Sequence, residues 1–238
     1  MTNAPASLRY ELKLTCDASY LAQARTWLRL HPEGFRTAFP PRLVNSLYLD
    51  TPALNSFNAN LAGVGERQKL RLRWYGEIGD WRLETDACPS PITNPTLELK
   101  YKQNLLGGKR QQVLACVWDW QRPFSHLLAT IQQTADPEWQ QWLTATTQPT
   151  LINRYHREYY VTVDGAIRAT LDYNQMAYDQ RLSPRPNLQH PLPLPDLVVI
   201  ELKAAPEHSE RLQWAVGRFP IPRSRNSKYV NGILGGLG

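Results

Sequence analysis

The sequence lacks several features that would narrow its function at once. Its three cysteines, Cys16, Cys88 and Cys116, are odd in number and not spaced as CxxC, so neither a disulfide framework nor a zinc site is expected. No run of eighteen or more apolar residues occurs, and the first fifteen residues hold no apolar segment of the signal-peptide kind. We therefore expect a protein of the reducing cytoplasm with no membrane span.

A further absence concerns nucleotide-binding loops. Gly107-Gly108-Lys109 comes nearest to a Walker A motif, but it lacks the preceding glycine and the following Ser or Thr. If the chain binds a triphosphate, side chains rather than a glycine-rich loop must hold the phosphates.

Length and composition are those of a globular protein. The 238 residues are 42% hydrophobic and 20% charged, which allows a sizeable core. Neither a repeat nor a shift in composition marks a boundary, so we expect one domain over residues 1–238. With 27 Lys and Arg against 21 Asp and Glu, the net charge of +6 favours a polyanionic partner: nucleic acid, an acidic membrane surface or a phosphorylated small molecule.

Period-two alternation of apolar and polar residues predicts strands along most of the chain. The predicted strands are 8–15, 46–50, 68–75, 97–102, 153–163, 167–173 and 197–204, with 81–85 as a hairpin partner. Helix signals place helices outside these strands, at 17–30, 51–61, 123–134, 137–144 and 207–219. The proline-rich stretch 181–195 is expected to be a surface loop.

Charged residues occupy every second position in these strands. Those that follow the rule are Lys13, Lys69, Arg71, Arg73, Lys100, Lys102, Arg157, Arg168 and Lys203. In a single strand this pattern usually indicates a solvated outer face. Because the faces are mainly Arg and Lys, that interpretation weakens when all of them are taken together. A closed antiparallel barrel is the alternative arrangement, with the cations on the lumen and the apolar residues packed outward under helices.

Such a lumen suits phosphoryl transfer, in which positioning and electrostatics supply most of the catalysis. Arg offers bidentate contacts to phosphate oxygens, and Lys provides a compact charge. Glu11, Glu98 and Glu201 each precede a lysine by two residues on the same strand face. Carboxylates among cations can bind Mg²⁺ or Mn²⁺, although salt bridges that orient the lysines are the favoured interpretation of Glu11 and Glu98.

Short segments through nearly the whole chain resemble the VTC domain (vacuolar transporter chaperone type), a branch of the triphosphate tunnel metalloenzymes, which also include the CYTH proteins. Eight segments in order carry the resemblance: RYELK (9–13), SLYLD (46–50), KLRLRWYG (69–76), LELK (97–100), YHR (155–157), RATLD (168–172), IELK (200–203) and SKY (227–229). The resemblance implies an α+β fold, a closed antiparallel β-barrel that forms a triphosphate tunnel, with helices packed outside.

The resemblance also implies an activity. Eukaryotic members build inorganic polyphosphate from the γ-phosphate of ATP with a divalent metal such as Mn²⁺. Lys13, Arg71, Arg73 and Lys228 are the expected catalytic residues. Lys69, Lys100, Lys102, Lys109, Arg157, Arg168, Lys203 and Arg225 are expected to bind phosphate, of which Lys69, Lys102 and Lys203 are added because they share the alternating faces. Glu201 matches the metal-binding glutamate, with Glu11 and Glu98 as further candidate ligands.

One departure from the CYTH pattern bears on the reaction. CYTH-type hydrolases carry Glu-x-Glu-x-Lys on the first strand, whereas this chain has Arg9 at the first of those positions. The metal would then depend on Glu201, which favours the polymerase-like branch over the hydrolases.

Three functions stay open at this point. The first is a phosphotransferase that uses ATP to extend pyrophosphate or polyphosphate, the second a triphosphatase with water as acceptor, and the third a non-catalytic module that binds polyphosphate, inositol phosphates or nucleic acid. Nucleic-acid binding would place stacking aromatics among the basic residues. Trp74 and Tyr101 instead alternate onto the opposite face, with Tyr155 and Tyr159 as exceptions, so we expect no nucleic-acid partner.

Overall fold

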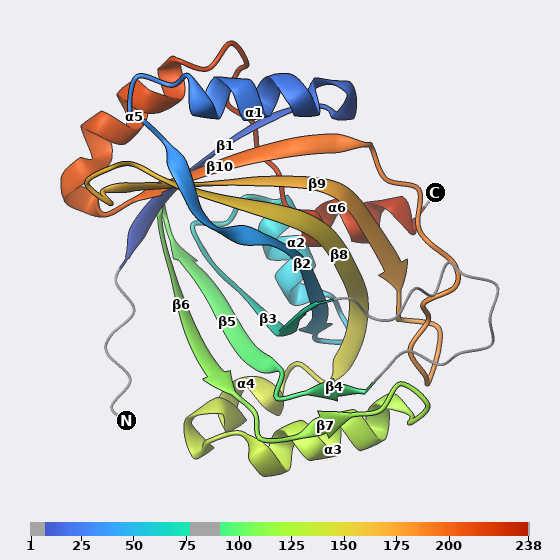
Figure 1. The fold of residues 1–238 in the computed structure, drawn as a ribbon. Coiled ribbons are helices and arrows are strands. Elements are labelled where there is room, and N and C mark those ends of the chain that lie inside the picture. Colours follow the sequence, from blue (N-terminus) through green and yellow to red (C-terminus); the bar gives the residue numbers. More distant parts are fainter. Residues whose placement is uncertain (1–7, 77–90, 238) are drawn as a thin grey trace.

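The computed structural model describes residues 8–76 and 91–237, in which antiparallel strands close into a ring (Figure 1). Around the ring the strands follow the order β1-β10-β9-β8-β2-β3-β5-β6 and return to β1. Their bounds are β1 (Arg9–Asp17), β2 (Arg36–Asp50), β3 (Glu66–Tyr75), β5 (Thr96–Gln103), β6 (Leu106–Val113), β8 (Gln148–Val161), β9 (Ile167–Asp179) and β10 (Leu197–Ala204). The expected α+β fold with a closed antiparallel barrel is therefore confirmed.

The alternation in the strands sorts side chains between the two faces of the ring. On β3, Leu70 and Leu72 are buried in the outer core with Trp74. Lys69 and Arg71 alternate with them and point the other way, into the lumen. Since successive strand residues face opposite sides, one sequence pattern produces both the core and the charged interior.

Helices cover the outer face of the ring in three groups (Figure 1). α1 (Leu21–Arg29) and α5 (Ser209–Gly217) pack on β9 and β10. α3 (Phe124–Thr134), α4 (Gln140–Leu143) and the two-stranded sheet of β4 (Ile92–Thr93) and β7 (Val117–Trp118) cover β3 and β5 through a tryptophan-rich core. α2 (Asn55–Leu61) contacts α6 (Lys228–Gly235), and both lie behind β2 and β8 in the figure.

The short 3-10 helices η1 (Ala18–Tyr20), η2 (Pro137–Trp139) and η3 (Pro206–His208) lead into α1, α4 and α5. Together these elements confirm the helices expected at 17–30, 137–144 and 207–219. Asp17 caps the first of them as predicted, because its carboxylate accepts from the Ser19 N–H at 2.9 Å.

Several elements differ from the sequence-based expectation. β2 begins at Arg36 rather than residue 46, β6 was not predicted, and the C-terminal tail forms α6. The sequence does not predict β6 because Gly107-Gly108 interrupts its alternation of polar and apolar residues. The structure gives a reason for the second glycine, since a Cβ at Gly108 would lie 2.5 Å from the Tyr101 ring. The strand predicted at 81–85 lies outside the described residues.

α2 starts at Asn55 rather than near Thr51. Leu54 before it takes a left-handed conformation (φ 55°), and the buried Asp50 carboxylate accepts from the N–H groups of Ser56 and Phe57, both at 3.0 Å. Asp50 therefore caps this helix from a distance, from the end of β2. In the described parts of the chain, no helix has the length and apolar character needed to cross a membrane.

Candidate active site

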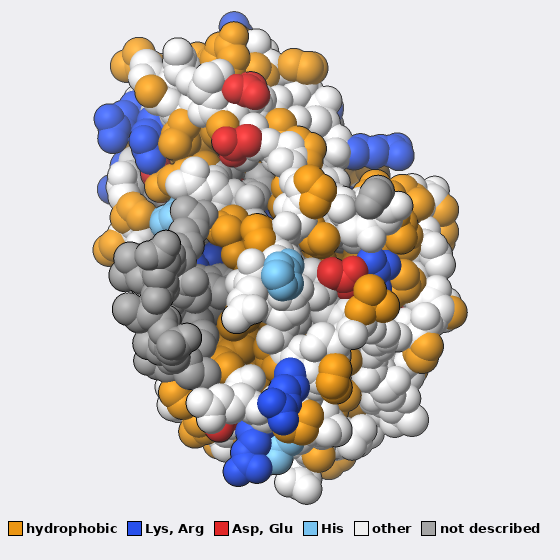
Figure 2. Space-filling model, turned by 90° about the vertical axis from the view of Figure 1, so that its right-hand side faces the viewer, with side chains coloured by type: hydrophobic (Ala, Val, Ile, Leu, Met, Phe, Trp, Pro, Cys, Tyr) orange, Lys and Arg blue, Asp and Glu red, His pale blue; other side chains and the backbone are white. Residues whose placement is uncertain are grey.

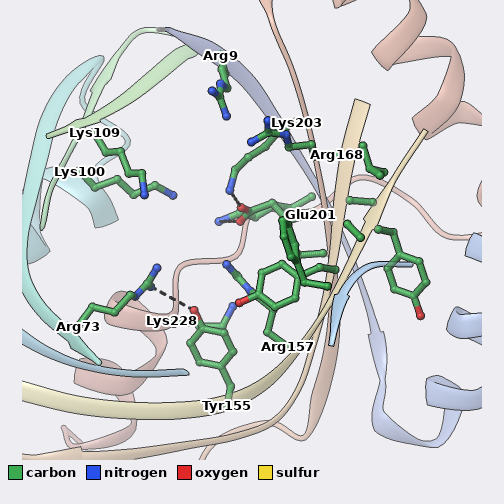
Figure 3. Close-up of a pocket in the computed structure, with 18 of the residues that line it drawn as sticks. Arg9, Arg73, Lys100, Lys109, Tyr155, Arg157, Arg168, Glu201, Lys203 and Lys228 are labelled. Carbon is green, nitrogen blue, oxygen red and sulfur yellow. Dashed lines mark hydrogen bonds and ion pairs between the residues drawn. The ribbon is translucent and has the colours of Figure 1, made fainter. Parts of the chain in front are cut away.

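The lumen of the ring holds a cavity of about 850 Å³ whose wall is dominated by cations. On the outer face shown in Figure 2, Lys and Arg instead stand in small separated groups among hydrophobic and uncharged side chains. The basic residues of the wall, several of them labelled in Figure 3, are Arg9, Lys13, Arg36, Lys69, Arg71, Arg73, Lys100, Lys109, Arg157, Arg168, Lys203 and Lys228. The charged strand faces thus point inward.

The cavity gathers most, but not all, of the cations that the sequence singled out. Lys102 and Arg225 are absent from its wall: Lys102 pairs in register with Arg67 toward the end of β5, and Arg225 is exposed ahead of α6. Arg9 and Arg36 line the wall without having been predicted to bind phosphate. Arg36 lies in the unpredicted part of β2, whereas Arg9 shares the alternation of Lys13 and could have been recognised from it.

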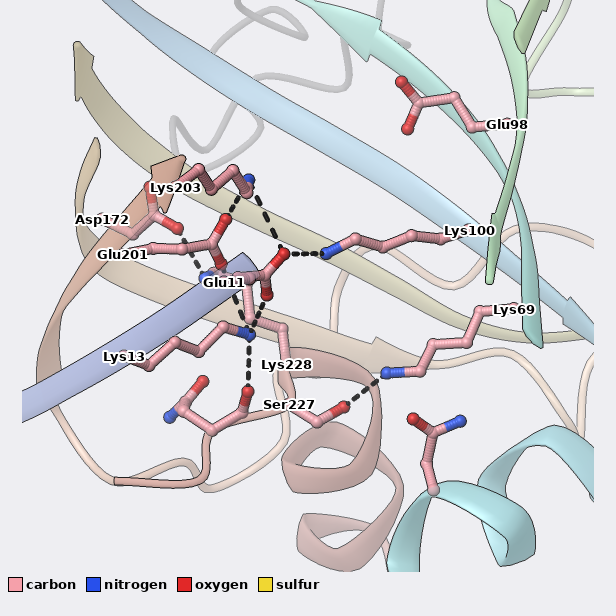
Figure 4. A network of polar contacts seen from close by, with 12 residues as sticks. Glu11, Lys13, Lys69, Glu98, Lys100, Asp172, Glu201, Lys203, Ser227 and Lys228 are labelled. Atoms are coloured by element: carbon pink, nitrogen blue, oxygen red, sulfur yellow. Dashed lines mark hydrogen bonds and ion pairs between the residues drawn. The ribbon is translucent and has the colours of Figure 1, made fainter. Parts of the chain in front are cut away.

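A group of alternating positive and negative side chains links β1 to β10 (Figure 4). In the antiparallel register Glu11 lies opposite Lys203, and Lys13 opposite Glu201. Lys13 Nζ is 3.1 Å from Glu11 Oε1 and 3.3 Å from Glu201 Oε2, and it donates to the Asn226 carbonyl at 2.8 Å. Lys203 contacts both glutamates as well. Opposite charges that face one another across paired strands stabilise this part of the ring.

These contacts set the charge states of the group. Burial disfavours the charged form of Lys13, but Glu11 and Glu201 outweigh it and hold the pKa of Lys13 above its usual value. Burial likewise opposes ionisation of Glu201, but Lys203, Lys13 and other cations nearby hold the pKa of this carboxyl well below its usual range. Burial and Glu201 oppose ionisation of Glu11 in the same way, but Lys100, Lys13 and Lys203 hold its pKa below the usual range. Both glutamates are therefore ionised near neutral pH.

Glu98 centres a second group, on the wall formed by β3, β5 and β6. It is 2% exposed and accepts from Arg71 Nε at 2.8 Å and Nη2 at 2.6 Å, with Arg73 Nη1 and Lys109 Nζ both 3.5 Å away. Burial opposes its ionisation, but these cations lower the pKa of the carboxyl. The geometry matches the expected role of Glu98 as a partner that orients cations.

Asp172 centres a third group that the sequence analysis did not assign. This fully buried carboxylate accepts from Arg157 Nε at 2.6 Å and Nη2 at 2.7 Å, and from Lys228 Nζ at 2.6 Å. The Tyr155 ring lies against the same two cations, 4.5 Å from Lys228 Nζ and 5.2 Å from Arg157 Cζ. Asp172 shares the alternation of Arg168, a signal that could have placed it on the lumen.

Two lysines between these groups, Lys69 and Lys100, have fewer carboxylate contacts to offset the cost of burying their charge. Burial, together with Lys13, Lys100 and Arg71, lowers the pKa of Lys69 well below its usual value, although its Nζ donates to Ser227 Oγ at 3.0 Å. Burial also lowers the pKa of Lys100 to about 8, despite Glu11 Oε2 at 3.0 Å. A polyanion beside these ammonium groups would favour their charged forms.

The carboxylates also bear on the expected metal. No three His, Cys, Asp or Glu side chains that could hold an ion lie together in residues 8–76 and 91–237. Mg²⁺ and Mn²⁺ need fewer protein ligands, because one or two carboxylates and the substrate phosphates commonly complete their coordination. Glu11 and Glu201, which share Lys13, offer such a pair. Glu98 fits a metal less well, because one of its oxygens already accepts from two nitrogens of Arg71 and, among the described residues, no second carboxylate is paired with its cations.

Comparison with known proteins agrees with this geometry. Residues 8–235 match the model of the VTC domain family. Among solved structures, HpAC1 from Hippeastrum, named as an adenylyl cyclase and described as having a dominant triphosphatase activity, superposes with a TM-score of 0.53 at 16% identity, covering 97% of this chain and 96% of its own. At that identity the likeness shows the fold.

Two further structures resemble the chain more distantly. PH1819 from Pyrococcus horikoshii OT3 has a TM-score of 0.46 at 13% identity, covering 95% of this chain and 98% of its own. A Vibrio parahaemolyticus protein named as an adenylate cyclase has a TM-score of 0.49 at 10% identity, with coverages of 94% and 96%. No curated protein matches. Because the family match spans nearly the whole described chain and the ring of strands is shared with HpAC1, the chain belongs to the VTC domain family, within the CYTH-like triphosphate tunnel fold.

Proposed function

We propose that the protein is a metal-dependent phosphotransferase that binds ATP or triphosphate in the cavity and transfers the terminal phosphate to inorganic polyphosphate. The observation that carries the proposal is the wall itself, where cations from strands around the ring and from α6 converge on one cavity. A chain of phosphates, with negative charge along its whole length, is the ligand that such a wall complements.

The proposed roles follow from the three charged groups. Arg71 and Arg73, oriented by Glu98, present guanidinium groups to phosphate oxygens. Lys13 and Lys228 supply compact charge beside the reacting phosphate, each fixed by a buried carboxylate. The remaining cations of the wall hold the other phosphates. The wall presents no evident nucleophile, so we propose direct in-line transfer.

Glu201, with Glu11, would hold the Mg²⁺ or Mn²⁺. When bound, such an ion neutralises phosphate charge and orients the phosphates. The two carboxylates lie beside Lys13 and Lys203, so cations of the wall are at hand for the phosphate oxygens that the ion leaves uncovered.

A triphosphatase is the second candidate. The support for it is the triphosphatase activity described for HpAC1, which has the same ring fold. The same wall would bind the substrate in both reactions, and only the acceptor would differ: a phosphate chain or water.

Product analysis separates the two candidates. Purified protein is incubated with ATP and Mn²⁺, and the products are resolved on a gel that shows chain length. Long polyphosphate supports the phosphotransferase, whereas released phosphate without polymer rejects it in favour of the triphosphatase. Arg71→Ala and Arg73→Ala should lose activity, and Arg110→Ala, an exposed change on β6 that leaves the wall intact, should retain it.

We also propose that residues 1–238 act as one domain. β1 near the start pairs with β10 near the end, and Lys228 of α6 reaches the same cavity. The low cysteine content supports the cytoplasm as the proposed location.

A further inference from the structure

An aromatic cluster lies among the cavity-lining residues and takes no part in the three charged groups. Phe39, Tyr75 and Tyr159 all line the cavity. The Phe39 and Tyr159 rings meet edge to face with centroids 5.9 Å apart. The Arg42 guanidinium carbon lies 5.8 Å from the Phe39 and Tyr159 centroids and 5.6 Å from that of Tyr75. We refer to these four residues as the aromatic rim.

The aromatic rim is open to solvent. Phe39 is 56% exposed and Tyr75 is 49% exposed, and Arg42 is exposed as well. Single exposed aromatics are common on protein surfaces and need no explanation. Three rings around one guanidinium, continuous with a cationic cavity, form instead a concave surface with flat apolar faces and planar hydrogen-bond donors.

The backbone holds the aromatic rim in place. β2 pairs with β8 from Arg36 onward, but its register shifts on both sides of Phe39, and Pro40-Pro41 separates Phe39 from Arg42. Bulges re-aim side chains at the rims of barrels, and the prolines restrict the backbone between the two residues. Phe39 and Arg42 are therefore presented by a stiff segment, which lowers the entropy lost when a ligand stacks.

We propose that the aromatic rim binds the nucleobase of a nucleoside triphosphate whose phosphates occupy the cavity. The proposal rests on the proposed function and names the substrate class of the same site. Aromatic side chains stack on the flat face of any base, and a guanidinium can donate to the acceptors on a base edge. The rim offers both kinds of contact in one place.

The spacing along β8 supports this placement. Tyr159 and Arg157 are two residues apart on the same strand face, which corresponds to about 7 Å, and both line the cavity. That separation is on the scale of a ribose between a stacked base and its first phosphate. The nucleotide would therefore lie with its base at the rim and its terminal phosphate inside, toward the charged groups on β1 and β10. Inorganic triphosphate has no base that could stack on the rim.

Calorimetric titration with ATP and with tripolyphosphate tests the proposal. Phe39→Leu and Arg42→Gln alter exposed side chains, so both variants should fold. We expect each to weaken ATP binding by roughly tenfold, the scale of one lost stacking contact. Phe39→Leu should leave tripolyphosphate binding unchanged, and Arg42→Gln, which removes one exposed charge, should weaken it far less than it weakens ATP binding. Tyr20→Leu, which removes a comparably exposed ring outside the cavity, is the matched control and should change neither affinity.

Fluorescence of an etheno-adenine triphosphate gives a second readout. Stacking on the rim should change its emission in the wild type and less so in Phe39→Leu. If ATP binding is unaffected in both rim variants, or if tripolyphosphate binding falls equally, the rim does not bind the base. If the wild type binds neither ligand, the proposed function fails and this inference with it. Tripolyphosphate binding without any gain for ATP overturns the inference alone.

Discussion

Lys13 Nζ lies 3.3 Å from Glu201 Oε2 across the β1–β10 pair, and 3.1 Å from Glu11 Oε1 on its own strand. Lys13 is thus shared, as Lys203 is, by the two carboxylates that best fit a metal. A divalent ion and a phosphate chain that arrive together can exchange these partners, since the glutamates would turn to the ion and Lys13 to the phosphate. Metal binding and phosphate binding are therefore expected to strengthen each other.

Glu201→Gln tests the metal role. The amide keeps the shape of the side chain but removes a negative charge from the wall, so in metal-free buffer tripolyphosphate should bind at least as tightly as in the wild type. Metal-dependent turnover should fall by about a hundredfold or more, because the metal loses a ligand whose charge it needs. Binding is measured by calorimetry and turnover by phosphate release or polymer formation.

Glu138→Gln is the matched control for this change, since Glu138 lies outside the cavity and bridges to Arg110 on the surface. Its activity should equal that of the wild type. Full metal-dependent turnover in Glu201→Gln would show that another group holds the ion.

Arg71 and Glu98 give a second prediction, on stability. Arg71→Ala leaves a carboxylate with 2% exposure facing only the more distant Arg73 and Lys109, and removing one partner of a buried pair costs about 3–5 kcal/mol of unfolding free energy. Adding Glu98→Gln to Arg71→Ala should restore part of that loss. Urea denaturation of the two single variants and the double variant measures the coupling. Additive losses would show that the pair contributes no coupling.

The alternation predicted most strands of the ring, but neither their closure nor the side on which their charges lie. Alternation on β3 separates Lys69 and Arg71 from Leu70 and Leu72 without saying which set faces a lumen. Closure depends on the short pairing of Arg9 and Tyr10 with β6, a contact between distant segments that no local pattern reveals. Before the structure was known, only the family resemblance favoured inward-facing cations.

The helix α6 was missed because packing overrides local propensity there. Gly232 would count against a helix, yet a Cβ there would lie 2.3 Å from Leu151 Cδ2, so close packing of α6 on β8 requires the glycine. Asp172 was missed as a functional residue because its partners, Arg157 and Lys228, lie 15 and 56 residues away along the chain. A carboxylate that orients cations is recognised only once the fold brings them together.

Asp172→Asn should destabilise the protein by about 3–5 kcal/mol at neutral pH, because Arg157 and Lys228 would stay buried without a counter-charge. Burial opposes ionisation of Asp172, but Arg157 and Lys228 hold its pKa below the usual value. Its stabilising contribution is therefore present above the unfolded pKa and is lost as the pH falls through the folded pKa. The difference between wild type and variant, measured by chemical denaturation, should shrink as the pH is lowered below about 4.

Tripolyphosphate should restore part of the stability lost in Asp172→Asn, since the freed cations gain a new anion. Asp164→Asn, at an exposed carboxylate that bridges to Arg211, should leave stability nearly unchanged. A loss in Asp172→Asn that persists undiminished into acid would mean that its charge is not the cause.

Lys100 predicts how affinity depends on pH. Burial lowers its pKa to about 8, with Lys203 and Lys13 adding to the shift and Glu11 and Glu201 opposing it. Because the folded pKa lies below the unfolded one, the stability that Lys100 contributes is full above the unfolded pKa and is lost as the pH falls through the folded pKa. Binding has the opposite preference, since a phosphate favours the charged lysine.

Tripolyphosphate binding should therefore take up a proton near pH 8 and above, and affinity should fall by up to about tenfold per pH unit for this one group as the pH rises past 8. Calorimetry in two buffers of different ionisation enthalpy counts the protons. Lys100→Arg, which stays charged at any working pH, should bind with about one proton fewer at pH 8.5–9, whereas Lys69, whose pKa is also lowered, continues to contribute. Equal proton uptake in the two proteins would place the titrating group elsewhere on the wall.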